Sequence, residues 1–134
     1  MSTSLNKGAK IASWVAQLVV AVILLQTLYF KFTAAPEPVW IFQQLGVEPW
    51  GRIATGILEL IAGLAILVPA TVVLGALLSA GLMVGAILSH LTVLGIEVQN
   101  DGGTLFVMAL VVFAASLVVL WIRRRELPVV GDRF

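Results

Sequence analysis

The stretch Ile11–Phe30, IASWVAQLVVAVILLQTLYF, decides the fold class, because it holds twenty residues without a charged side chain. A helix needs about 20 apolar residues to cross the roughly 30 Å of hydrocarbon in a bilayer. The apolar region of a cleaved signal peptide is shorter, about 7–15 residues, and is followed by small residues. This stretch instead ends in Leu28-Tyr29-Phe30 and is followed by Lys31. We therefore expect it to be retained as a first membrane span.

The composition extends this prediction to the whole chain. Of its 134 residues, 60% are hydrophobic and 11% are charged, whereas soluble domains have roughly 25% charged residues. A chain of this size cannot bury so much apolar surface in its own core, and lipid leaves helices as the conformation that pairs every backbone group. We predict an all-α membrane protein, a single domain over residues 1–134 built as a four-transmembrane-helix bundle. The expected spans are about 11–30, 50–68, 71–89 and 104–122.

The three connections between these spans differ in character. Residues 68–71, Val-Pro-Ala-Thr, predict a tight turn, so that the second and third spans form an antiparallel hairpin. The long loop Lys31–Arg52 contains Trp40, a residue type that favours the headgroup level of a membrane. We expect a short interfacial helix in this loop, stopped at Gly46. The third connection ends in residues 100–104, Asn-Asp-Gly-Gly-Thr, which is typical of a turn followed by a helix cap.

The distribution of lysine and arginine predicts the orientation. Cytoplasmic loops of membrane proteins carry an excess of these residues. Six of the eight flank the two ends of the chain, and the loops between spans hold only Lys31 and Arg52. We therefore expect both termini in the cytoplasm and the protein in the cytoplasmic (inner) membrane of a bacterium. The six residues are Lys7, Lys10, Arg123, Arg124, Arg125 and Arg133.

The sequence also excludes several classes of function. It has no cysteine, which excludes disulfides, thiol redox catalysis and iron–sulfur ligation within this chain. Its net charge is +1 and it has no long basic stripe, so nucleic acid is not an expected partner. His90 is its single histidine and cannot form a metal site alone, so no metal is expected.

Glu59 is the strongest functional candidate, because an ionisable group at membrane depth is costly and suggests a function. Helical spacing places Arg52, Thr55 or Gly56, Glu59 and Gly63 on one face of the second span. Two interpretations stay open: a structural brace hydrogen-bonded to a neighbouring helix, or a proton carrier or ligand anchor.

Other polar residues lie at a similar depth in the outer half of the predicted bundle. Lys31 ends the first span, and it either reaches the outer headgroups or pairs with Glu59 or Glu48. His90 ends the third span, and it either makes an interfacial hydrogen bond or relays a proton to a ligand. We expect these groups to face one outward-open pocket. The ligand-binding or proton-carrying candidates are Glu59, His90, Lys31, Arg52 and Gln26.

Gly81 and Gly85 form a GxxxG step, which lets membrane helices approach closely. We predict them as helix-packing residues. The second span of the same chain is the expected partner because the short turn forces contact, and another copy of the chain is the alternative.

These motifs together resemble the DoxX-like family of small bacterial membrane proteins. The similarity runs from about Leu25 to Leu127, and two strings, Leu25–Thr33 and Asn100–Gly103, resemble a branch common in Bacteroidetes-type bacteria. The motifs are Lys31-Phe32, Gly46-Val47-Glu48-Pro49-Trp50, Gly56-Ile57-Leu58-Glu59-Leu60-Ile61-Ala62-Gly63, Leu67-Val68-Pro69 and Gly81-Leu82-Met83-Val84-Gly85-Ala86-Ile87-Leu88-Ser89-His90-Leu91.

The resemblance implies a four-helix membrane bundle with Lys31, Glu59 and His90 in a shared pocket. It also implies several kinds of function, since relatives are associated with a thiosulfate:quinone oxidoreductase, with oxidative-stress complexes or with the assembly of membrane proteins. We expect a redox-associated membrane subunit without catalytic activity of its own. It would hold no cofactor, but a quinone is a candidate bound ligand, with a carboxyl and an imidazole as proton donors near its two carbonyl oxygens.

Alternatives to the redox subunit stay open. One is a non-catalytic structural or assembly subunit that docks a larger membrane protein complex, and a homo-oligomer is a further expected form. The last alternative is a small transporter or a lipid-binding enzyme that uses the same pocket. Glu59→Gln separates the pocket-based functions from docking, because only the former require the carboxyl.

Overall fold

The computed structural model describes residues 5–128 and 131–133, and its regular structure over these ranges is entirely helical. The prediction of an all-α protein is therefore confirmed. The long helices are α1 (Lys7–Phe32), α2 (Pro36–Gln44), α3 (Trp50–Ala65), α4 (Val72–Ser89) and α5 (Thr104–Ile122). Short helical turns are η1 (Pro69–Thr71), η2 (His90–Leu94), η3 (Arg124–Glu126) and η4 (Gly131–Arg133).

Three helical segments are long and apolar enough to cross a membrane, namely Lys7–Phe32, Pro69–Leu94 and Thr104–Ile122. This agrees with the first, third and fourth predicted spans, and the prediction of a multi-pass membrane protein is confirmed. Helix α3 lies where the second span was expected. It has 16 residues, about 24 Å at 1.5 Å per residue. It ends at Ala65, four residues before Pro69, which has no backbone N–H to continue the helix.

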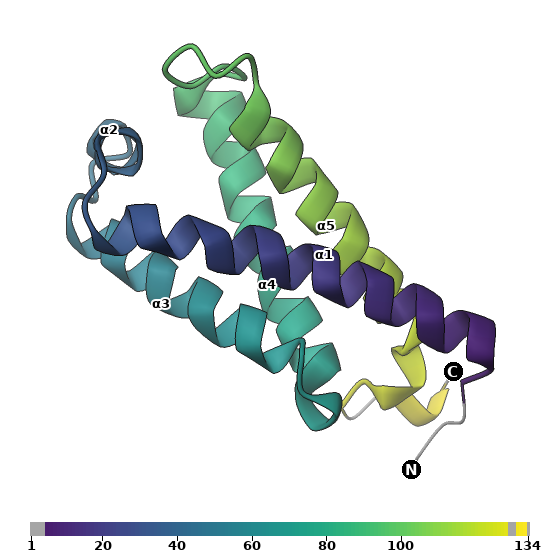
Figure 1. Ribbon diagram of the computed structural model, residues 1–134. Helices are drawn as coiled ribbons and strands as arrows, with labels where there is room; N and C mark the ends of the chain where they lie inside the picture. The colour runs from purple at the N-terminus through teal and green to yellow at the C-terminus, as the bar shows by residue number, and fades with distance from the viewer. Residues whose placement is uncertain (1–4, 129–130, 134) are drawn as a thin grey trace.

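Apart from α2, the long helices form two antiparallel pairs, α1 with α3 and α4 with α5 (Figure 1). The pairs pack together near η1, at what we call the turn end of the bundle, where α1 begins and α5 ends. From there they diverge toward the opposite end, the α2 end, where α2 and the α4–α5 loop lie (Figure 1). This divergence is the feature that makes room for the site described below.

The core holds the two pairs together and is densest toward the turn end. Val20 of α1, Ile66 at the end of α3 and Val119 of α5 are completely buried. Gly75 permits the closest approach of α4 to α3, because a Cβ there would lie 2.5 Å from the Ile66 backbone nitrogen. Further apolar side chains, most of them small or branched, complete this core: Ala16, Ala21, Leu24, Ala62, Val72, Ala76, Met83, Ala109 and Val112.

Gly81 and Gly85 were expected to pack against the second span of the same chain, but they make no such close contact. A Cβ on either residue would have no described atom within 4 Å, other than those of its own neighbourhood in the helix. The physical reason is the divergence of the helix pairs, which has already opened a gap at this level of α4. Gly75 makes the close contact instead.

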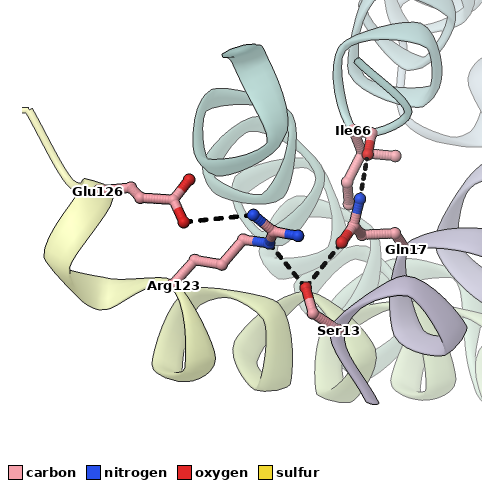
Figure 2. A network of polar contacts seen from close by, with 5 residues as sticks. All are labelled: Ser13, Gln17, Ile66, Arg123 and Glu126. Atoms are coloured by element: carbon pink, nitrogen blue, oxygen red, sulfur yellow. Dashed lines mark hydrogen bonds and ion pairs between the residues drawn. The ribbon is translucent and has the colours of Figure 1, made fainter. Parts of the chain in front are cut away.

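A buried chain of hydrogen bonds closes the turn end, and we call it the turn-end network (Figure 2). The Arg123 Nε donates to Ser13 Oγ over 2.8 Å, and Ser13 Oγ donates to Gln17 Oε1 over 2.7 Å. The Gln17 Nε2 then donates to the Ile66 carbonyl oxygen over 2.8 Å, while Arg123 also pairs with Glu126 at 3.2 Å. Because the Ile66 carbonyl has no partner within its own helix end, Gln17 of α1 supplies the missing cap of α3.

The loops follow the predicted turn chemistry. Helix α2 ends at Gln44. Gly46 follows two residues later with a backbone φ of 75°, as expected where a glycine ends a helix. At the start of α5, the Asp101 carboxylate accepts hydrogen bonds from the backbone nitrogens of Gly103 and Leu105, at 2.8 and 3.1 Å. The predicted helix cap is therefore confirmed.

Candidate ligand-binding site

A cavity of about 1020 Å³ lies between the diverging helix pairs at the α2 end. It is lined by residues of all five long helices, and most of the lining is apolar. Ligand pockets in proteins typically measure about 300–1000 Å³, so this cavity can hold a substantial small molecule. Its polar and titratable lining residues include Gln26, Thr27, Lys31, Glu37, Glu59, His90 and Asp101.

Glu59 and Lys31 form an ion pair in the wall of this cavity. The Lys31 Nζ lies 2.8 Å from Glu59 Oε1, and the two side chains are 15% and 6% exposed. The contact lacks the angles of a hydrogen bond, so Oε1 is a buried oxygen without a hydrogen-bond partner among the described residues. The structure thus selects the ion pair over the headgroup position for Lys31, and it leaves the carboxylate with unused capacity to accept.

Glycines on α3 bring this pair together. A Cβ on Gly56 would lie 2.7 Å from the Phe32 ring, and one on Gly63 would lie 2.7 Å from Leu25. Both neighbours belong to α1, so the two glycines let α1 approach the face of α3 that carries Glu59. The predicted face of Arg52, Gly56, Glu59 and Gly63 is indeed the buried side of α3.

Arg52 lies beside the cavity and does not line it. Its Nε lies 2.9 Å from Glu48 Oε1, one turn earlier in the chain, and its Nη1 donates to the backbone carbonyl of Lys31. That carbonyl belongs to the last turn of α1, where carbonyl groups lack helical partners. Arg52 therefore positions the end of α1, and with it Lys31.

His90 lines the cavity from the start of the π-helical turn η2 and is 6% exposed. Its Nδ1 lies 2.8 Å from the Gly95 carbonyl oxygen, and its ring contacts the Phe106 ring edge-on at 5.4 Å. A carbonyl oxygen only accepts, so Nδ1 carries the proton of this hydrogen bond. In the neutral imidazole, Nε2 then has a free lone pair and acts as an acceptor.

Two further carboxylates lie where α2 and the α4–α5 loop meet the cavity. Burial raises the pKa of Glu37, and the nearby Asp101 carboxylate raises it further. For Asp101, burial also raises the pKa, but the backbone nitrogens of Leu105, Val98 and Gly103 and the neighbouring His90 outweigh it and lower the pKa overall. This end of the cavity is therefore acidic.

Of the predicted site residues, the cavity brings together Glu59, Lys31, His90 and Gln26. Gln26 is exposed at the cavity, and its side chain makes no hydrogen bond to any described residue. Glu37 was missed, although its place between two prolines in the predicted interfacial helix was a signal. Within the described ranges, no three acidic or histidine side chains are arranged to hold a metal ion.

Comparison with the curated proteins and with the solved structures gives no match. A family model does match, over residues 15–119, which is more than half of the chain. The matched range runs from the first turns of α1 into the last turn of α5, and it contains Lys31, Glu59 and His90. The match agrees with the resemblance carried by these motifs, and the chain belongs to the DoxX-like family.

Proposed function

We propose that this protein binds a small, mainly apolar molecule in the cavity and holds its polar head with Glu59, His90 and Lys31. The observation that supports this most is the Glu59 side chain, which lines a large cavity, pairs with Lys31 and accepts no hydrogen bond from the described chain. A carboxylate can accept several hydrogen bonds, and a hydrogen bond to a charged group contributes about 1.5–3 kcal/mol. A hydroxyl of a bound ligand would supply the missing donor.

The hydrogen bonds that Glu59, His90 and Lys31 can make distinguish an oxidised quinone from its reduced hydroquinone. A quinone presents two carbonyl acceptors, whereas its reduced hydroquinone form presents two hydroxyl donors. The ionised Glu59 acts as an acceptor, and His90 acts as one through Nε2 when its imidazole is neutral. The acceptors therefore favour a hydroquinone head, and the Lys31 ammonium is available to donate to one of its oxygens.

The proposal includes four membrane spans with both termini in the cytoplasm. Helix α3 packs along α1, and Ile53, Ile57 and Ile61 on its outer side are exposed apolar residues suited to lipid. The beginning of α1 and the end of α5 lie at the same end of the bundle, as an even number of spans requires. At that end the Arg124 guanidinium stacks on Trp121 at 4.2 Å, a pairing suited to the inner membrane interface.

A role as a subunit of a redox-associated complex is supported by membership of the DoxX-like family. The chain contains one histidine, three methionines and no cysteine. A haem pair or an iron–sulfur cluster needs more ligands of these types than the chain supplies. In this proposal a partner protein carries the electrons, and the chain described here binds the hydroquinone in the outer half of the cytoplasmic membrane.

Glu59→Gln is expected to weaken hydroquinone binding at least about tenfold, because hydrogen bonds to charged groups contribute about 1.5–3 kcal/mol. The measurement is equilibrium binding of decylubiquinol and of decylubiquinone to the protein in lipid nanodiscs. Wild-type protein should bind the reduced form more tightly. Lys31 ends α1 and can extend toward the headgroups once unpaired, so the variant should fold.

Glu48→Gln is the matched control for this experiment. It makes the same substitution in the other glutamate of an ion pair near the end of α1, but Glu48 does not line the cavity. Its binding should equal that of the wild type. If wild-type protein bound neither form of the probe, the proposed function would be overturned, and docking to a larger complex would become the better account.

A further inference from the structure

We infer that the ligand is an amphiphile dissolved in the bilayer, and that it enters the cavity sideways through a gap between α3 and α4 at Gly81 and Gly85, where its apolar chain stays when it is bound. This inference deepens the proposed function and rests on it. Both glycines are exposed and both line the cavity. Because neither has a side chain and a Cβ on either would contact nothing outside its own helix turn, the cavity wall is open at this position.

The geometry of α4 places the gap on the side of α3. Gly75 marks the direction of α3, since it contacts the Ile66 backbone, and Ser79 marks the direction of α5, since its Oγ lies 2.8 Å from Ser116 Oγ. At about 100° per residue, Gly85 and Gly81 lie about 80° and 120° from Gly75, on the side away from Ser79. They therefore lie between the contact with α3 and the lipid-facing surface of α4.

The surface around the gap is suited to lipid. Leu77, Val84 and Leu88 are exposed at helical spacing around the two glycines. These positions form one continuous stripe along α4, and the glycines interrupt it. An apolar chain could therefore extend from the lipid through the gap into the cavity and contact only apolar groups on the way.

The gap and the ion pair lie at the same depth in the bundle. Gly75 of α4 contacts Ile66 at the end of α3. Distances along both helices toward the α2 end can therefore be counted from this contact. Glu59 is seven residues beyond Ile66, about 10 Å at 1.5 Å per residue. Gly81 and Gly85 are six and ten residues beyond Gly75, about 9 and 15 Å on the same scale. A head bound at Glu59 would therefore leave its chain in front of the two glycines.

The α2 end offers a less suitable entrance for a neutral amphiphile. Helix α2 lines the cavity there, together with the carboxylates of Glu37 and Asp101. The apolar chain of a molecule arriving from water would have to pass these carboxylates, whereas a chain arriving from the bilayer meets glycine backbone and aliphatic side chains.

The test is the dependence of binding on chain length. Gly81→Leu and Gly85→Leu, singly and together, fill the gap while leaving Glu59, Lys31 and His90 in place. We expect decylubiquinol to bind the double variant at least tenfold more weakly than the wild type, in nanodiscs under reducing conditions. The tail-less counterpart of the same hydroquinone should bind both proteins within about twofold, which also shows that the double variant is folded.

Val84→Leu is the matched control, because Val84 lies between the two glycines in sequence and faces outward without lining the cavity. The Val84→Leu variant should bind decylubiquinol and the tail-less hydroquinone as tightly as the wild type does. Unchanged binding of both hydroquinones to the double variant would overturn entry at the gap and leave the proposed function standing. Equal weakening of both would also overturn it, because leucine would then act at the head and not on the chain. Failure of the wild type to bind either probe would instead overturn the proposed function.

Discussion

Lys31→Met is expected to lower the free energy of unfolding by about 3–5 kcal/mol, the usual range for removing one partner of a buried ion pair. The substitution leaves the Glu59 carboxylate 6% exposed and without its counter-charge. No described hydrogen bond compensates, because Oε1 has none. The measurement is reversible unfolding of the purified protein in mixed micelles, compared with the wild type at neutral pH.

A second variant shows whether this loss comes from the unpaired charge. Lys31→Met combined with Glu59→Met removes both charges and fills the space with side chains of similar length. Replacing a buried ion pair by apolar residues is often neutral or stabilising, so the double variant should recover most of the stability. A Lys31→Met protein as stable as the wild type would mean that Glu59 does not depend on Lys31, and it would remove the ion pair from this account.

Gln17→Leu is expected to lower the free energy of unfolding by about 2–4 kcal/mol, because each buried polar group left without a partner costs about 1–3 kcal/mol. The variant leaves two groups in this state, the Ile66 carbonyl oxygen and the Ser13 hydroxyl hydrogen. Leucine has a similar volume, so packing changes little. Unfolding in mixed micelles is again the measurement.

Gln26→Leu is the matched control, since it makes the same substitution on the same helix. Gln26 is exposed, and its change should alter stability by no more than about 0.5 kcal/mol, as for most surface substitutions. If Gln17→Leu and Gln26→Leu changed the free energy of unfolding equally, the turn-end network would not be what holds α1, α3 and α5 together.

Hydropathy was enough to predict the helices, because the long apolar stretches can satisfy their backbone groups in lipid only as helices. Helical spacing was enough to predict the buried face of α3, from Arg52 to Gly63. The pairing of Lys31 stayed open, because its long side chain can reach either the headgroups or Glu59. Only the approach of α1 to the α3 glycines decides between the two.

The remaining features depend on tertiary arrangement. Gly81 and Gly85 have the spacing of a packing motif, but the direction in which the helix pairs diverge leaves open space beside them. Ser13 and Gln17 lie four residues apart on one helical face, a signal of a shared polar contact. Their partners, Arg123 and the Ile66 carbonyl, are distant in the chain, so the sequence could not identify them.

The content of the cavity in the native membrane shows directly whether Glu59 anchors a ligand. The protein is purified in mild detergent without overexpression, and bound lipophilic molecules are identified by mass spectrometry beside a Glu59→Gln variant produced in the same way. We predict that the wild type retains an amphiphile with a hydroxylated head, such as a hydroquinone, and that the variant loses it. If wild type and variant retained the same molecules in equal amounts, or if the wild type retained none, Glu59 would not be the anchor of a ligand site.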